Sequence, residues 1–225
     1  MWTNLSNNLP LTLLGSILLA LPSCFWLGRA AYALPREIDA NLPVQPPASH
    51  NLSKRVFLLA GPFIALVFSL FFGSSPAAIS STGFMLVLLA LAWIDAETGY
   101  LPDKLTLPLL WAGLLVNLND TFVPLEHAVI GAAGGYVFLW LVYRVFWLFT
   151  RREGMGFGDF KLVAALGAWL GWMNLPWLLL VATVTSLAVL LVQRLLPVKR
   201  EITGMIRFGP YLALAGIAGI LGMWL

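Results

Sequence analysis

Residues 86–95 read LVLLALAWID, an apolar run that ends in a carboxylate. A membrane-spanning helix needs about 20 apolar residues, and apolar segments of this kind recur along the chain. We therefore expect an all-α, polytopic membrane bundle with about eight hydrophobic segments, two of which, 104–118 and 160–173, are short for full spans. In chain order the segments are 11–33, 56–73, 80–96, 104–118, 127–149, 160–173, 175–195 and 207–225.

The composition supports a membrane protein and excludes several other classes. Hydrophobic residues make up 60% of the 225 residues and charged residues only 10%, whereas a soluble domain carries about 25% charged residues. A disordered chain, an ordinary soluble globule and a nucleic-acid-binding module are excluded, so we expect membrane lipid but no nucleic acid among the partners. The single cysteine, Cys24, excludes an intrachain disulfide and a multi-cysteine zinc site, and we expect it to be an inert buried thiol.

All 13 lysines and arginines lie in or flank the first, third, fifth or seventh connector between these segments. The positive-inside rule places those connectors in the cytoplasm, so eight spans leave both termini periplasmic. The first connector, residues 34–55, is rich in proline and is predicted to be a short cytoplasmic loop. Residues 1–10 carry no lysine or arginine, so we expect the first apolar run to be a retained span rather than a removable signal.

Two acidic residues are predicted to lie at the same membrane depth. Asp95 ends the third apolar segment and Asp159 opens the sixth, which puts both at the cytoplasmic edge. A carboxylate that borders hydrocarbon is costly and is a functional candidate by default. Two carboxylates at one site share a proton, so one can activate water while the other donates to a carbonyl. The sequence leaves open which aspartate takes which role.

The segments around these aspartates resemble the type IV prepilin peptidases. Residues 94–117, IDAETGYLPDKLTLPLLWAGLLVN, resemble the first aspartate motif of that family, and residues 154–172, GMGFGDFKLVAALGAWLGW, resemble its GxGD motif. Residues 208–216, FGPYLALAG, resemble its C-terminal FGP segment. The family cleaves leader peptides from type IV prepilins and from the pseudopilins of type II secretion, and its two catalytic aspartates map onto Asp95 and Asp159.

The resemblance implies a membrane aspartyl endopeptidase of the bacterial inner (cytoplasmic) membrane, with its active site at the cytoplasmic face and prepilins or pseudopilins as substrates. Residues 1–79 would form a two-span N-terminal region, and residues 80–225 the peptidase core. Many members hold zinc through paired CxxC motifs in a large first loop, whereas loop 34–55 here has no cysteine. We therefore expect no zinc or other metal, and no cofactor for cleavage. Many members also methylate the new N-terminus, and S-adenosylmethionine would be required only if this chain retains that activity.

Further residues near the aspartates have both functional and structural interpretations. Gly156 and Gly158 would let backbone approach closely and keep the Asp159 carboxylate uncrowded. Asp103 follows a proline and precedes an apolar run, so a helix-capping role is expected rather than catalysis. Glu97 either attracts a basic leader or is only solvated. Lys161 either anchors its helix at the membrane surface or tunes Asp159 or contacts substrate, and the resemblance favours the functional role because the family motif has a lysine there.

Two other classes of protein share some of these features. A small proton- or cation-coupled transporter could use paired intramembrane aspartates, but such a protein is expected to carry its acids near the membrane midplane and to show an internal repeat. Here the acids fall at one edge, and the sequence contains no repeat. A protease of the presenilin type would carry a PAL tripeptide near its C-terminus, which this sequence lacks.

Overall fold

A computed structural model describes residues 9–42, 59, 61–64, 75–152, 154–195 and 207–223 of the chain. Within these ranges all regular elements are helices and no strand occurs, which confirms the all-α expectation. Most of segment 56–73 and of loop 34–55 lies outside the described residues, as do several of the cationic residues used for the topology. These are Lys54, Arg55, Lys199 and Arg200.

The structure divides into two compact units, residues 1–93 and 94–225. The first unit contains α1 (Leu9–Ile38) and most of α3 (Pro76–Thr98). Cys24 is a free, buried thiol on α1, 1% exposed. Helix α1 continues through Pro35, so the loop predicted to begin at residue 34 in fact begins after Ile38. One carbonyl of this last turn is paired beyond the helix, because the Asp39 N–H donates to the Pro35 carbonyl at 3.0 Å.

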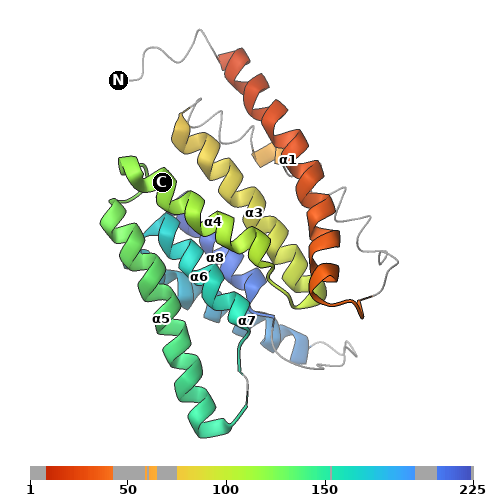
Figure 1. Cartoon of the computed structure of the whole chain (residues 1–225), viewed down its shortest axis with the longest axis vertical. Coiled ribbons are helices and arrows are strands. Elements are labelled where there is room, and N and C mark those ends of the chain that lie inside the picture. Colours follow the sequence, from red (N-terminus) through yellow and green to blue (C-terminus); the bar gives the residue numbers. More distant parts are fainter. Residues whose placement is uncertain are drawn as a thin grey trace. The chain divides into compact units, whose positions relative to one another are not determined.

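The second unit begins with the last turn of α3, from residue 94, and is built around α6 (Phe157–Leu170). Every residue of α6 from 162 to 170 is buried, as expected for a helix that is apolar on all sides. Helix α6 contacts several of its neighbours in this unit (Figure 1). These are α4 (Asp103–Val116), α5 (Leu125–Thr150), α7 (Leu175–Leu195) and α8 (Gly209–Gly222), together with the short 3-10 helix η2 (Trp172–Asn174).

Among the described residues, three helices are long and apolar enough to cross a membrane: Ala77–Thr98, Leu125–Thr150 and Trp172–Leu195. Helices α4, α6 and α8 have 14 residues each, or about 21 Å, less than the roughly 30 Å of a bilayer core. The short lengths of α4 and α6 agree with the sequence prediction. Helix α8 lies within the predicted segment 207–225, whose last two residues are outside the described ones.

Close backbone packing joins α5 to α6. A Cβ atom added to Gly131 of α5 would lie 2.5 Å from the carbonyl oxygen of Gly167 on α6, and a Cβ added to Gly135 would lie 3.0 Å from a Val163 methyl. Glycines at such a crossing let two helices approach within direct backbone contact, which is how helices associate in lipid. The position of α6, and of the residues in its first turn, therefore depends on these small residues.

A buried amide holds the opposite end of α6. Asn117, in the 3-10 helix η1 (Asn117–Asn119), is fully buried, and its Nδ2 donates to the carbonyl of Ala168 at 2.9 Å. Its Oδ1 accepts from the Phe122 N–H at 3.0 Å. Nearby, the Trp169 Nε1–H donates to the Leu109 carbonyl at 2.8 Å. The Asn117 side chain thus both donates and accepts hydrogen bonds, as a buried polar group requires. Together with the Trp169 bond, these contacts join α4, η1 and α6.

Candidate active site

Asp95 lies in the last turn of α3, within the second unit, and is 4% exposed. The backbone N–H of Gly209, the first residue of α8, donates to Asp95 Oδ2 at 3.1 Å. The first N–H groups of a helix have no partner inside it, so this bond satisfies one of them. A Cβ on residue 209 would lie 2.8 Å from the same oxygen. Only glycine therefore lets the start of α8 approach the carboxylate this closely.

Helix α3 ends just beyond Asp95. Gly99 adopts the left-handed conformation, with φ +74°, and its N–H donates to the Asp95 backbone carbonyl at 2.9 Å. A glycine in this conformation is a common helix terminator. The guanidinium of Arg207 donates to the backbone carbonyl of Ala96, one of the last carbonyls of α3. The end of α3 is therefore attached to the segment that begins α8.

Asp159 lies in the first turn of α6 and is 7% exposed. Its carboxyl interacts with the backbone N–H of Gly156, the N-cap residue, as an acidic residue at the third position of a helix commonly does. Burial raises the pKa of Asp159 to about 7, the neighbouring charge of Asp95 adds to the rise, and the Gly156 N–H opposes it. The two aspartates are therefore close enough to interact electrostatically, and the structure brings them to one site.

The two glycines of the GxGD motif meet different surroundings. A Cβ on Gly158 would lie 2.7 Å from the Cβ of Leu101, in the connector between α3 and α4. A Cβ on Gly156 would lie 3.7 Å from Asp159 Oδ2, which is an ordinary contact. Gly158 is thus needed for the first turn of α6 to pack against the connector that follows α3, whereas position 156 has room for a methyl group.

Lys161 and Asp103 form an ion pair. Lys161 Nζ lies 2.6 and 2.7 Å from the two Asp103 carboxylate oxygens, and the side chains are 30% and 53% exposed. The N-cap of α4 is Pro102 and no side chain caps this helix, so the prediction that Asp103 caps it is wrong. Its carboxylate is directed to Lys161 instead, while its charge still lies in the first turn, where it complements the helix dipole. Glu97 is half-buried in the last turn of α3.

Gly209 and Arg207 were not predicted from sequence as site residues. The resemblance of residues 208–216 to the FGP segment marked the region of Gly209 without assigning it a contact. Arg207 was counted only as one of the cations that set the topology, although it lies two residues before the glycine that contacts Asp95. Among the described residues, no group of three or more His, Cys, Asp or Glu side chains is placed to hold a metal ion.

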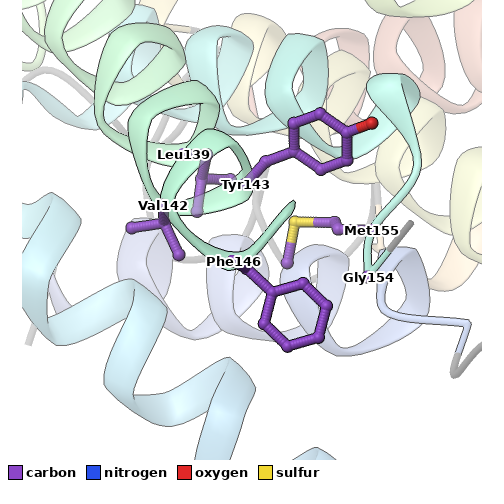
Figure 2. A pocket seen from close by; sticks show the side chains of 6 residues that line it. All are labelled: Leu139, Val142, Tyr143, Phe146, Gly154 and Met155. Carbon is purple, nitrogen blue, oxygen red and sulfur yellow. The ribbon is translucent and has the colours of Figure 1, made fainter. Parts of the chain in front are cut away.

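An apolar pocket adjoins the loop that leads into α6 (Figure 2). Its volume is about 190 Å³, and it is lined by Leu139, Val142, Tyr143, Phe146, Gly154 and Met155. The Tyr143 ring also packs against Phe157 and Phe160 of α6, with centroid distances of 5.5 and 5.7 Å. One wall of the pocket is thus continuous with the turn of α6 that carries Asp159.

Comparison with known proteins gives consistent results. Residues 82–191 match the type IV leader peptidase family. The chain is 46% identical over 212 residues to a prepilin leader peptidase/N-methyltransferase of Dickeya chrysanthemi, a match that covers 90% of the chain and 68% of the relative. It is 42% identical over 214 residues to the protein of that name from Aeromonas hydrophila, covering 95% and 69%.

A protein with the same name from Burkholderia pseudomallei strain K96243 is 52% identical over 147 residues, which is 65% of the chain and 47% of the relative. The chain therefore spans between about half and two thirds of the length of these relatives. No solved structure matches the chain.

Proposed function

Because the chain belongs to the type IV leader peptidase family, we propose that it is a membrane aspartyl endopeptidase that removes the short basic leader of prepilins or pseudopilins. The observation that carries this proposal is the pair of buried carboxyls, Asp95 and Asp159, brought to one site by α3, α6 and α8. We assign both aspartates as catalytic residues. The arrangement matches what a shared-proton hydrolysis of a peptide bond needs.

The reaction follows from the properties of the pair. One carboxylate takes a proton from water as the water oxygen attacks the carbonyl carbon of the scissile peptide, and the other carboxyl gives its proton to the carbonyl oxygen. The carboxyl that took the proton from water then gives it to the amide nitrogen as the C–N bond breaks, and the other carboxylate regains a proton from a hydroxyl group of the tetrahedral intermediate. The leader leaves with a new carboxylate, and the mature chain has a new amino terminus. With its pKa near 7, Asp159 can hold the shared proton at neutral pH.

The pocket beside Met155 offers an apolar surface close to this chemistry. A prepilin substrate whose basic leader stays in the cytoplasm, and whose apolar helix docks laterally against the bundle, would bring an apolar segment next to its scissile bond. The pocket is lined by aliphatic and aromatic side chains, and its wall continues into the first turn of α6. We propose that it helps to hold the substrate beside Asp159.

We further propose that the protein spans the bacterial inner membrane with both termini periplasmic and with the site at the cytoplasmic face. The arrangement of all 13 cations in or beside alternate connectors supports this topology. Lys161 lies two residues after Asp159 at the start of α6, and Arg207, just before α8, contacts the end of α3 that carries Asp95. Helix ends with cationic side chains are typical of the cytoplasmic side of a membrane protein.

Cleavage is proposed to need neither a metal nor a cofactor. The names of the relatives couple the peptidase to an N-methyltransferase, and S-adenosylmethionine would be the methyl donor for such a reaction in this chain. The pocket beside Met155 does not fit that molecule, because its lining is almost wholly apolar and supplies no side-chain carboxylate or amide for the ribose and amino-acid groups.

The test is co-expression with a panel of prepilins and pseudopilins in cells that lack other prepilin peptidases. The proposal predicts that at least one substrate loses its leader, as read by the mass of its mature N-terminus. The same spectrum reports methylation as the mass of one additional methylene group. If no prepilin in the panel is processed while the protein is present in the membrane, the proposed function is contradicted.

The transporter alternative receives no support from the family comparison. The positions of the acids also argue against it. The charge pattern of the sequence puts Asp95 and Asp159 at the cytoplasmic edge of the membrane, whereas the coupling site of a transporter is expected near the bilayer midplane.

A further inference from the structure

Arg207 interacts with the end of α3 that carries Asp95. Its guanidinium donates to the Ala96 carbonyl, one residue beyond Asp95. Its positive charge also acts on the Asp95 carboxyl. Two residues later, the Gly209 N–H donates directly to Asp95 Oδ2 at 3.1 Å. The segment that opens α8 therefore holds Asp95 by its backbone and supplies a cation to its carboxyl.

The surroundings of the two aspartates differ in a way that separates their roles. Both aspartates are buried, which disfavours the ionised form of each carboxyl group. At Asp95 a donated N–H and a nearby cation oppose this effect of burial, because both favour the ionised form. The groups that act on Asp159 are its own burial, the charge of Asp95 and one N–H from Gly156. Lys161, the cation nearest to Asp159 in sequence, pairs with Asp103 instead. Within the part of the chain that the structure describes, Glu97 and Lys104 are further charged residues near these helix ends.

We propose that Arg207 is a positioning residue of the peptidase reaction: it fixes the end of α3 to the start of α8 and, with the Gly209 N–H, makes Asp95 the carboxylate that takes the proton from water. Asp159 is then the group that donates a proton to the substrate carbonyl. This inference rests on the proposed function, and it assigns the two roles that the sequence leaves open.

The charge of Arg207 is expected to affect the pH dependence of cleavage. A carboxyl pair is active while it holds one proton, so the rate falls at low pH, when both groups are protonated, and at high pH, when both are ionised. If Arg207 acts on Asp95, removing its charge makes the first ionisation harder and moves the acid limb of the pH–rate profile upward. The alkaline limb, which reports loss of the proton from Asp159, moves less.

The test compares Arg207→Gln and Arg207→Lys with the wild-type protein, using a purified prepilin and the full chain in liposomes. For Arg207→Gln we expect kcat to fall about tenfold with KM nearly unchanged, and the acid limb to rise by about half a pH unit, since an exposed cation acts through solvent. For Arg207→Lys, which keeps the charge, we expect the acid limb to return towards its wild-type position. Arg144→Gln is the matched control, because Arg144 is also exposed and lies over Trp140 of α5, 5.4 Å from the ring centroid.

A second measurement needs no variant of Arg207. Because Arg207 is exposed, added salt should screen its charge and move the acid limb of the wild-type protein and of Arg144→Gln upward. If Arg207→Gln does not fold, the salt dependence of the wild-type acid limb tests the role of Arg207 instead.

Several outcomes would overturn the inference. They are an Arg207→Gln profile with both limbs unchanged, a shift of the alkaline limb in place of the acid limb, no recovery of the acid limb with lysine, and no effect of salt on the wild-type acid limb. These outcomes are distinct from failure of the proposed function, because in that case the wild-type protein would cleave no prepilin at all.

Discussion

Replacement of Gly209 by alanine tests the contact between α8 and Asp95. The added Cβ would lie 2.8 Å from Asp95 Oδ2, 2.9 Å from its Cγ and 3.1 Å from its Cβ. These atoms belong to a short side chain in a buried site, so the start of α8 must move away. The hydrogen bond from residue 209 is then lost or lengthened. A hydrogen bond to a charged group contributes about 1.5–3 kcal/mol, which corresponds to a rate loss of roughly 10- to 150-fold.

The assay is cleavage of a purified prepilin by the full chain in liposomes, with kcat/KM as the measured quantity. Gly222→Ala is the matched control, because it lies on the same helix and a Cβ there would meet nothing within 4 Å. We expect the control to keep wild-type activity and both variants to insert equally. If Gly209→Ala cleaves within twofold of the wild-type rate, the close approach of α8 to Asp95 is not needed for the reaction, and the reasoning is refuted.

Three further predictions follow from the same structure. Since the pKa of Asp159 is raised to about 7, its carboxyl keeps its proton below that pH and loses it above. The cleavage rate should therefore fall as pH rises through about 7, and a cleavage rate that stays constant up to pH 9 would contradict this. Gly158→Ala should lower the cleavage rate about tenfold or more, because its Cβ would lie 2.7 Å from the Cβ of Leu101. Gly156→Ala should keep a rate within a few-fold of the wild-type rate. Equal losses in the two variants would argue against the close packing of Gly158 on Leu101. Asn117→Ala should lower the free energy of unfolding by about 1–3 kcal/mol, measured as a drop in thermal midpoint that the exposed Asn119→Ala control does not show.

The positions of the two aspartates were accessible from sequence because each is a local feature. Asp95 ends an apolar run and Asp159 follows a glycine-rich turn at the start of another, and the cost of a carboxylate at the edge of hydrocarbon makes such residues conspicuous. The all-helical architecture was accessible for the same reason, since runs of apolar residues in a chain with few charges leave few other solutions.

The contacts that shape the site were not accessible, because they join residues far apart in the chain. The hydrogen bond from Gly209 to Asp95 spans 114 residues, and the one from Arg207 to Ala96 spans 111. Which apolar helix packs against which is decided by close backbone approach, as at Gly131 and Gly167, and hydrophobicity alone does not encode it. The ion pair between Lys161 and Asp103 could not be predicted either, because it joins residues 58 apart in the chain. Asp103 was therefore predicted to be a helix cap.

The central claim is that Asp95 and Asp159 together cleave the leader from a prepilin. The most direct measurement is the N-terminal mass of a prepilin incubated with membranes that contain the wild-type protein, Asp95→Asn or Asp159→Asn at matched levels. The proposal predicts a mature N-terminus with the wild-type protein and an intact leader with either variant, although both variants still insert. Full processing by either asparagine variant, in membranes free of other peptidases, would contradict the claim.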